Sequence, residues 1–496
     1  METYFIFTLA LTIFISLLLK PILSLLLNTK KLPPGPVTLP IIGSFLWLWK
    51  SFWQLEPLIR KLQSQYGPII TLHIGSCPAI FISNHSLAHQ ALIQNGAVFA
   101  DRPPTMATNQ LTISAAGYGP TWRRLRRNLT VKILHPSCVK AYGGARKWVL
   151  NILASRLKDR ESEGIRVVDH FRYSMFCLLV LMCFGDKLDE TQIKQIEQVQ
   201  RRLLLSFSRL HLLNLWPSFT KIVLKKWWAE LFQFRKDQEN VLLPLIRARK
   251  EAKLSNGDDF VLAYVDTLLD LQLPDEKRNL TEYEVISLCS EFLNSGTDTT
   301  STALQWIMAN IVKYPTIQER LFEEIQGVVE ETTEEVKDED LQKMPYLKAV
   351  VLECLRRHPP SHFVLPHSVT HDVVLDSHVV PKNGIVNFMV ADMGWDAQVW
   401  KDPMDFKPER FLNAGDQGFD LTGTREIKMM PFGVGRRICP AASLAVLHLE
   451  YFVANLVWTF EWRAVEGDEI DLSEKQEFTM VMKNPLKANI SPRVNK

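Results

Sequence analysis

Hydrophobic residues in most of the chain recur with the period of an amphipathic helix. This pattern extends over residues 86–381, where polar stretches separate one helical segment from the next. Residues 68–74 and 78–83 are instead short β-branched runs bounded by glycine and asparagine, which predicts a hairpin. A second β-rich patch is predicted at residues 373–375 and 378–381. The sequence therefore predicts a fold that is mainly α with minor β.

The first residues carry a longer and denser apolar run. Residues 4–27 are almost entirely apolar, and a helix of this length, rising about 1.5 Å per residue, crosses a bilayer core. A cleaved signal peptide is the alternative, but no basic region precedes the run and no small-residue cleavage pattern precedes Lys30 and Lys31. With Glu2 on one side and these lysines on the other, the positive-inside rule places the rest of the chain in the cytosol. We therefore predict a single-pass anchor over residues 1–29.

Prolines follow the apolar run directly. Each proline within residues 32–40 fixes its own backbone dihedral and restricts the residue before it, so we expect a stiff, basic and proline-rich hinge over residues 30–40. The remainder contains no low-complexity linker and no internal repeat. This favours one catalytic domain over residues 41–496.

Composition narrows the class of protein. The 496 residues are 47% hydrophobic and 22% charged, which excludes a disordered or fibrous chain. A net charge of only +3 argues against a nucleic-acid binder. Cys is present 7 times without a CxxC pair, which fits neither a disulfide framework nor a zinc site, so we expect a reducing compartment.

One cysteine has surroundings that suit a metal ligand. Residues 432–440 form a glycine-containing loop that delivers Cys439 to the start of an apolar stretch with helical character. The N–H groups of a helix N-terminus and a nearby cation such as Arg437 stabilise a thiolate. Pro440 suits the first helical position, where its missing N–H has no partner to lose. The alternative is that Cys439 is a buried structural cysteine, which is the usual role of a cysteine without such surroundings.

A polar cluster lies in the middle of the longest predicted helix. Thr281 and Glu284 form a capping-box pattern, and the helix should run to about Tyr314. Residues 294–302 are poor helix formers whose side chains compete for backbone hydrogen bonds. Such a conflict is typical of a functional site, where a loosened turn admits water. A polar solvent face is the alternative.

Two further residue pairs have helical spacing. Glu353 and Arg356 share a face of a helix predicted to start near Pro345. Trp122 and Arg126 are adjacent on another helix, within a basic patch. Periodicity alone leaves open a surface ion pair for the first and a nucleic-acid patch for the second.

Three other stretches have surface character. Residues 225–232 mix lysines with aromatic residues, which indicates either a bilayer interface or core packing with lysines reaching to solvent. Residues 330–340 are acidic and are predicted to be a solvated loop or helix face. Arg123, Arg124 and Arg127 form either a docking face for an acidic redox partner or plain surface charge.

Together these motifs resemble those of the cytochrome P-450 family. The loop over residues 432–439 matches its Phe-x-x-Gly-x-Arg-x-Cys signature in register, and residues 294–300 resemble its oxygen-activation motif. Its Glu-x-x-Arg pair and its Pro-Glu-Arg-Phe motif match residues 353–356 and 408–411, and all motifs follow the family's order. Stretches such as residues 291–300 resemble plant microsomal members of family 89. Two positions depart from the pattern, namely Ala441 in place of glycine and Ser295 in place of a smaller residue.

The resemblance implies a role for each matching residue. Cys439 would be the axial ligand of the iron of haem b, in a loop shaped by Phe432 and Gly435. Thr299 would hydrogen-bond dioxygen and Asp298 would supply protons. The implied haem-carboxylate contacts are Trp122, Arg126, His367 and Arg437, and the implied buried structural trio is Glu353, Arg356 and Arg410.

The resemblance also implies a fold and an activity. The expected P-450 fold holds haem between the long central helix and the cysteine loop, with a transmembrane helix at the N-terminus. The expected enzyme is a monooxygenase of plant specialised metabolism that hydroxylates or epoxidises a small apolar substrate. Its electrons would come from NADPH through a membrane-bound NADPH-cytochrome reductase, with a cytochrome b-type protein as a further donor. The expected location is the endoplasmic reticulum membrane, with the catalytic domain facing the cytosol and no nucleic acid as partner.

Two other functions remain open at this point. An oxygen-independent haem-thiolate isomerase or dehydratase needs no proton relay to dioxygen, so the neighbouring Asp298 and Thr299 speak against it. A non-catalytic haem sensor is compatible with the sequence.

Overall fold

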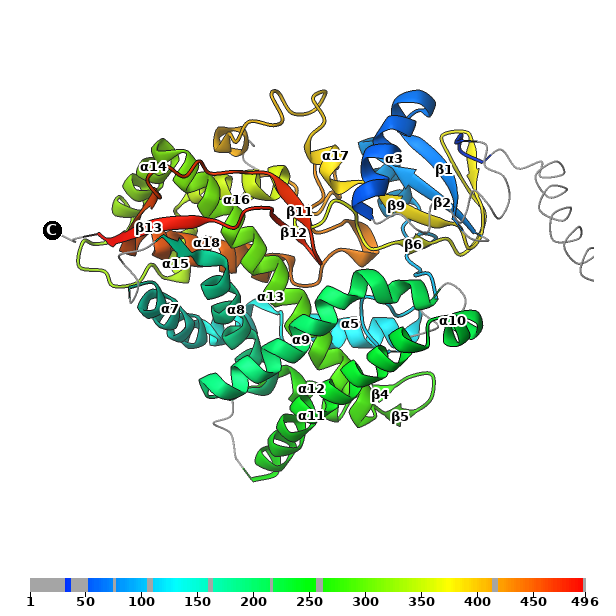
Figure 1. Ribbon diagram of the computed structural model, residues 1–496, viewed down its shortest axis with the longest axis horizontal. Coiled ribbons are helices and arrows are strands. Elements are labelled where there is room, and N and C mark those ends of the chain that lie inside the picture. Colours follow the sequence, from blue (N-terminus) through cyan, green and yellow to red (C-terminus); the bar gives the residue numbers. More distant parts are fainter. Residues whose placement is uncertain are drawn as a thin grey trace, which may run out of the picture. The chain divides into compact units, whose positions relative to one another are not determined.

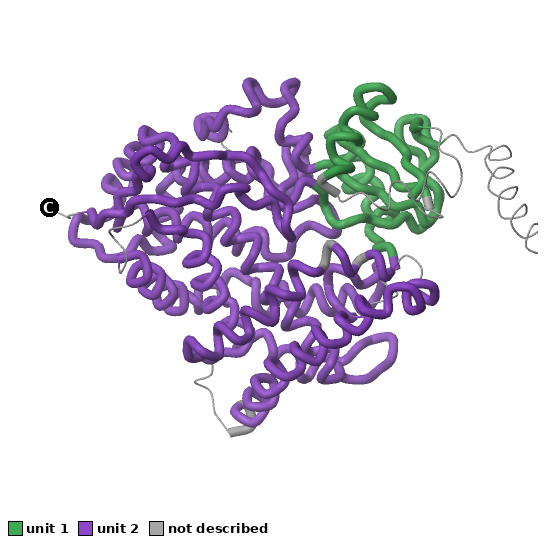
Figure 2. Tube along the Cα trace, viewed as in Figure 1, with its two compact units in different colours: residues 1–103, 363–389 green, residues 104–362, 390–496 purple. Residues whose placement is uncertain are grey.

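The computed structural model describes most of the chain. It covers residues 32–36, 52–74, 77–104, 110–158, 164–214, 217–255, 262–412 and 418–493. The predicted anchor over residues 1–29 and most of the hinge over residues 30–40 lie outside the described residues. The chain divides into two compact units, one formed by residues up to 103 with residues 363–389, and the other by residues 104–362 and 390–496 (Figure 2). The single domain over residues 41–496 stays a prediction.

The smaller unit is built on a four-stranded sheet in the order β1-β2-β9-β6. Strands β1 and β2 pair antiparallel, with Ile69 opposite Ile82, so the predicted hairpin is confirmed. Apolar side chains of α3 pack against this hairpin. The second predicted β patch is also confirmed, because β7 and β8 form an antiparallel pair. The elements are α3 Phe52–Tyr66, β1 Ile69–Ile74, β2 Cys77–Ile82, α4 His85–His89, β6 His367–Ser368, β7 Val373–Leu375, β8 His378–Val380 and β9 Ile385–Phe388.

The larger unit is mainly helical, as the periodicity predicts. Its longer helices are α5 Pro120–Lys132, α7 Gly143–Lys158, α8 Val167–Phe184, α9 Glu190–Leu210, α11 Lys225–Ser255, α13 Glu282–Lys313, α14 Pro315–Gln326, α16 Pro345–Arg357 and α18 Ala442–Thr459. Its shorter helices are α6 Pro136–Ala141, α10 Pro217–Val223, α12 Tyr264–Leu269, α15 Asp338–Leu341 and α17 Val390–Gly394. Its strands are β3 Ile165–Arg166, β4 Gln272–Leu273, β5 Arg278–Asn279, β10 Phe460–Ala464, β11 Glu474–Gln476, β12 Met480–Met482 and β13 Lys487–Pro492.

Helix α13 crosses the larger unit (Figure 1) and packs against α8, α16 and α18. The Thr281 hydroxyl accepts a hydrogen bond from the Glu284 N–H, and the Glu284 carboxylate accepts one from the Thr281 N–H. The predicted capping box and the long helix are therefore confirmed. Among the described residues, α8 and α18 are apolar and long enough to cross a membrane, but most of their side chains are buried, as in core helices.

The acidic side chains of residues 330–340 are exposed or half-buried in a loop and a short helix, as predicted, but two of them also bind side chains of the core. The Asp338 carboxylate pairs with Arg146, whose side chain is fully buried. Glu335 accepts a hydrogen bond from the Tyr451 hydroxyl at 2.6 Å. Charge density alone predicted solvation, but buried donors on α7 and α18 need these carboxylates as partners.

The Arg146 pair yields a stability prediction. Asp338→Ala leaves a buried guanidinium without its carboxylate, so we expect the free energy of unfolding to fall by about 2 to 4 kcal/mol. Glu339→Ala is the matched control, because Glu339 pairs with Lys140 where both side chains are largely exposed. Thermal unfolding of both variants would measure the difference, and equal midpoints would contradict the assigned role of Asp338.

A second stability prediction concerns pH. Burial, and secondarily the charge of Arg146, lowers the pKa of His448 on α18 to about 3. The unfolded chain binds this proton near pH 6.5, so stability contributed by the neutral ring is lost as pH falls from about 6.5 towards 3. Between pH 7 and pH 5 the wild type should lose about 2 kcal/mol more than His448→Gln, measured by denaturant unfolding. A His371→Gln control, at an exposed position, should follow the wild type.

Candidate active site

The loop that carries Cys439 is closed by its own backbone. The Cys439 N–H donates to the Phe432 carbonyl at 2.8 Å. Gly433 and Gly435 have φ of 68° and 71°, a left-handed conformation that favours glycine. Burial raises the pKa of the Cys439 thiol, while the Ala441 N–H and the charge of Arg126 act in the opposite direction. The fold therefore supplies the N–H group and the cation that a thiolate needs.

Alanine at position 441 fits this loop without backbone strain. Ala441 has φ −100° and ψ 19°, outside the left-handed region, and its N–H is the group that bonds the sulfur. Helix α18 begins at Ala442, so Pro440 does not occupy the first helical position as predicted. The short 3₁₀ turn at Gly435–Arg437 and the bond to Phe432 hold the chain in a loop up to this point.

Three of the predicted haem-carboxylate contacts lie together beside the cysteine loop. The Arg126 guanidinium donates to the Ile438 carbonyl at 2.6 Å. The Arg437 guanidinium carbon lies 4.3 Å from the centroid of the Trp122 ring, and that of Arg126 lies 5.5 Å from it. The structure thus gathers two cations around the Trp122 ring, whose indole N–H donates to the Ile113 carbonyl at 3.1 Å.

His367 belongs to the smaller unit. It is buried, its Nδ1 lies 2.6 Å from the Phe99 carbonyl oxygen, and its ring meets Phe388 edge to face. Its contact with a haem carboxylate stays a prediction.

The polar cluster of α13 is accommodated within an unbroken helix, whereas a loosened turn was expected. The Thr299 hydroxyl donates to the Ser295 carbonyl at 2.7 Å, so it satisfies a local acceptor. A Cβ at Gly296 would lie 2.6 Å from a methyl carbon of Leu179, so this glycine allows α8 to approach closely. Ser295 is exposed and Thr299 partly so, which leaves one side of the cluster accessible.

Asp298 has a different environment from Thr299. It is buried, and its carboxylate accepts hydrogen bonds from the Arg201 guanidinium and, at 2.8 Å, from the Thr479 hydroxyl. Arg201 also donates to Glu477 at 2.8 Å. Sequence reasoning missed Arg201 and Thr479, because neither belongs to a local pattern with Asp298.

The structure brings the predicted structural trio together. Arg356 donates to both oxygens of Glu353 at 2.7 and 2.8 Å, and both side chains have 0% exposure. The Arg410 Nε lies 3.2 Å from Glu353. The alternative of a surface ion pair does not apply, because the pair is fully buried.

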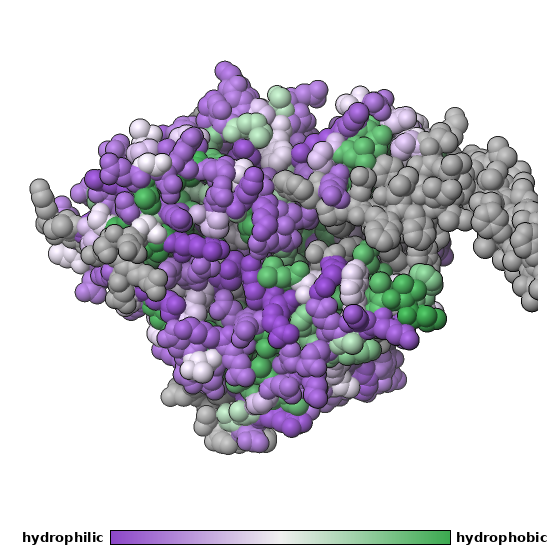
Figure 3. Space-filling model, in the orientation of Figure 1, coloured by the Kyte–Doolittle hydropathy of each residue, from purple (hydrophilic) through white to green (hydrophobic). Residues whose placement is uncertain are grey.

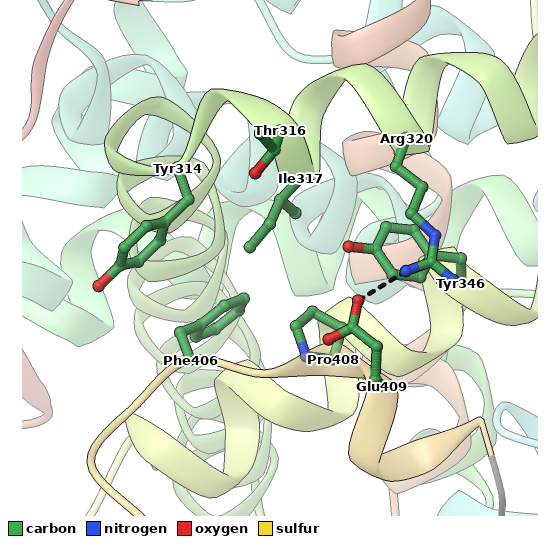
Figure 4. Close-up of a pocket in the computed structure, with 8 residues that line it drawn as sticks. All are labelled: Tyr314, Thr316, Ile317, Arg320, Tyr346, Phe406, Pro408 and Glu409. Carbon is green, nitrogen blue, oxygen red and sulfur yellow. Dashed lines mark hydrogen bonds and ion pairs between the residues drawn. The ribbon is translucent and has the colours of Figure 1, made fainter. Parts of the chain in front are cut away.

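A separate pocket lies between α14, α16 and residues 406–409 (Figure 4). Arg320 donates to Glu409 at 2.6 Å across its mouth and covers the Tyr346 ring. Its charged groups are paired and no predicted site residue lines it, so we assign it no role.

The residues present fit a haem. A cysteine sulfur with an N–H donor and a neighbouring cation would serve as a ligand of the iron, and the guanidinium groups of Arg126 and Arg437 beside the Trp122 ring would serve as partners for carboxylates. The accessible side of α13 carries a hydroxyl group at Thr299. This donor set matches the group that the sequence motifs imply.

Comparisons with known proteins agree with this geometry. The family model described as Cytochrome P450 matches residues 33–492. The chain is 53% identical over 487 residues to Cytochrome P450 89A9 of Arabidopsis thaliana, with 94% of each chain covered. It is 30% identical over 479 residues to Isoflavone 3'-hydroxylase of Medicago truncatula, with 92% of each covered. A solved zebra fish cytochrome P450 structure with abiraterone shares the fold, with a TM-score of 0.71 at 23% identity, covering 89% of this chain and 100% of that one.

The family match covers nearly the whole chain, and the plant relative is similar along almost its entire length. The chain therefore belongs to the cytochrome P450 family and is a haem b monooxygenase that draws electrons from NADPH through a reductase.

Proposed function

We propose that this P450 inserts one oxygen atom from dioxygen into a small apolar plant metabolite, by hydroxylation or epoxidation. The observation that carries the proposal is the Cys439 sulfur, held by the Ala441 N–H near the charge of Arg126. Haem b, when bound, supplies the activation of dioxygen and the transfer of one oxygen atom to the substrate. A relative whose name specifies hydroxylation, Isoflavone 3'-hydroxylase, supports the same class of reaction.

The chain's own residues would bind the cofactor and move protons. Cys439 would coordinate the iron, and Trp122, Arg126, Arg437 and His367 would hold the carboxylates. The Thr299 hydroxyl would hydrogen-bond dioxygen, and the Asp298 carboxylate would pass protons towards it through water. The trio of Glu353, Arg356 and Arg410 would act structurally by holding α16 to the turn Pro408–Phe411 that carries Arg410.

We also propose that the protein acts at the endoplasmic reticulum membrane, with NADPH-cytochrome reductase and a cytochrome b-type protein as electron donors. The apolar run over residues 4–27 supports an anchor. A second contact with the bilayer is supported by α10, where Phe219, Ile222 and Val223 are exposed and apolar residues gather (Figure 3). In the neighbouring stretch over residues 225–232, Trp228 is buried in a core cluster while Phe232 is exposed.

The substrate can be identified by metabolite profiling of a knockout, followed by turnover of candidate compounds with reductase in microsomes. We expect NADPH and oxygen consumption together with a product that contains one added oxygen atom. Product formation without oxygen or NADPH would instead support an isomerase or dehydratase, and the absence of turnover with any accumulated metabolite would support a haem sensor.

Removal of the sulfur ligand tests the haem site. Cys439→Ala should abolish haem binding, because it removes the sulfur that would coordinate the iron. Soret absorbance and the spectrum of the carbon monoxide complex measure the loss. Cys138→Ala, a partly exposed cysteine on α6, is the control that should retain both. A thiolate-type carbonyl spectrum in Cys439→Ala would refute the assignment.

Removal of the α13 hydroxyl tests the oxygen site. Thr299→Ala should lower the ratio of product formed to NADPH consumed by about tenfold or more, because a positioned proton-transfer group is lost. Thr299→Ser keeps the hydroxyl and should retain most of the coupling. Equal coupling in the wild type and in Thr299→Ala would show that the hydroxyl takes no part in oxygen activation.

A further inference from the structure

Residues 113–116 form hydrogen bonds with two different parts of the larger unit. On one side, the Glu291 carboxylate of α13 accepts the N–H groups of Ile113 and Ser114, each at 2.7 Å. On the other side, the Ile113 carbonyl accepts the Trp122 indole N–H at 3.1 Å and the Arg437 guanidinium at 3.2 Å. Arg437 also donates to the Ala116 carbonyl at 2.7 Å. One short segment therefore joins α13 to two donors of the haem site.

The carboxylate of Glu291 is well suited to hold this segment. Burial raises the pKa of Glu291, while the hydrogen bonds from Ser114 and Ile113 oppose that rise. Both carboxylate oxygens are used, one for each backbone N–H. Hydrogen bonds from N–H groups to a carboxylate are shorter and stronger than those to a neutral acceptor. The peptide groups of Ile113 and Ser114 are thereby held in place.

The orientation of these peptides determines where Trp122 and Arg437 lie. An arginine side chain has several rotatable bonds and gains considerable freedom when its acceptors move. In this site two carbonyls, those of Ile113 and Ala116, restrict the Arg437 guanidinium over the Trp122 ring. Glu291 touches neither donor directly, so any effect on them must pass through the peptides of residues 113–116.

Glu291 also lies on the accessible side of α13. Glu291, Ser295 and Thr299 are spaced four residues apart, which places them one above another on the helix. All of them retain some exposure in a helix that is otherwise mostly buried. The same helical face therefore carries the hydroxyl of the oxygen site and the carboxylate that holds residues 113–116.

We propose that Glu291 is a positioning residue which, through the peptides of Ile113 and Ser114, fixes the Arg437 guanidinium over the Trp122 ring for binding the haem carboxylates. The proposal rests on the proposed haem site for the identity of the bound group. The contact between Glu291 and residues 113–116 does not depend on that assignment.

The test compares Glu291→Gln with Glu282→Gln in the full-length holoenzyme. The two variants carry the same chemical change on the same helix, but Glu282 pairs with Arg247 on the surface. Glutamine keeps one acceptor oxygen and places an NH₂ group against the second backbone N–H. The first measurement is hydrogen exchange of the peptide containing residues 113–116, and the second is the rate of haem transfer to an excess of an apo-haem protein.

In Glu291→Gln we expect exchange of the Ile113 and Ser114 amides to accelerate about tenfold, and haem transfer to accelerate several-fold. The carbon monoxide complex should keep its thiolate-type spectrum, since Cys439 is untouched. Glu282→Gln should match the wild type in all three measurements. Should Glu291→Gln fail to fold, Glu291→Asp takes its place. This variant keeps the charge but is shorter by one methylene, so amide exchange and haem transfer should both be faster than in the wild type, by less than about tenfold.

Several outcomes would overturn the proposal. Unchanged amide exchange in residues 113–116 would show that Glu291 does not hold this segment. If exchange in peptides of α7 and α8 accelerated as much as in residues 113–116, the variant would be generally destabilised. Faster exchange with unchanged haem transfer would leave a structural contact without a positioning role. If Cys439→Ala retained a thiolate-type spectrum, the haem assignment itself would fail, and that result is independent of the exchange measurement.

Discussion

The hydrogen bond from the Cys439 N–H to the Phe432 carbonyl closes the loop on which the chemistry of this protein depends. Two glycines in left-handed conformations allow the chain to fold back over so few residues. Because the loop closes in this way, the Ala441 N–H reaches the sulfur and Arg126 lies near enough to influence it. The position of the Cys439 sulfur and the two groups that oppose the effect of its burial therefore have the same structural origin.

Helix α13 separates two environments that a sequence motif places side by side. Thr299 lies on the accessible face, and its hydroxyl donates a hydrogen bond to the Ser295 carbonyl of the same helix. The Asp298 carboxylate instead accepts hydrogen bonds from Arg201 of α9 and from Thr479, next to β12. The surroundings of the acid are thus set by elements other than its own helix. Any proton that passes through Asp298 passes through a carboxylate that already accepts two hydrogen bonds.

Buried charged side chains recur among the described residues of the larger unit, and several of them form ion pairs with one another. Glu353 and Arg356 are fully buried together, and Arg249 pairs with Asp266 in the core. Such pairs contribute little net stability relative to apolar packing, but removal of one member leaves an uncompensated charge. Loss of activity in a variant of these residues therefore has to be separated from loss of fold.

Local features of the structure followed from local sequence. The capping box at Thr281, the hairpin of β1 and β2 and the start of α16 at Pro345 were predictable, because caps, turns and prolines act within a few residues. The fully buried state of Glu353 was not predictable from periodicity, and the family resemblance was needed to expect it. The partners of Glu335 and Asp338, in the largely solvated stretch 330–340, were not predictable for the same reason, because they lie on distant helices.

The sequence by itself determined the helical class and the order of the motifs, since these depend on residue type and spacing, and the motif at residues 432–439 pointed to Cys439 as the proposed sulfur ligand. Only the tertiary structure decided that Arg201 holds Asp298 across 97 positions and that Glu291 holds Ile113 across 178. Contacts of this kind arise where helices cross, and the crossing is set by the packing of whole faces. No local pattern of residues encodes which side chains will meet there.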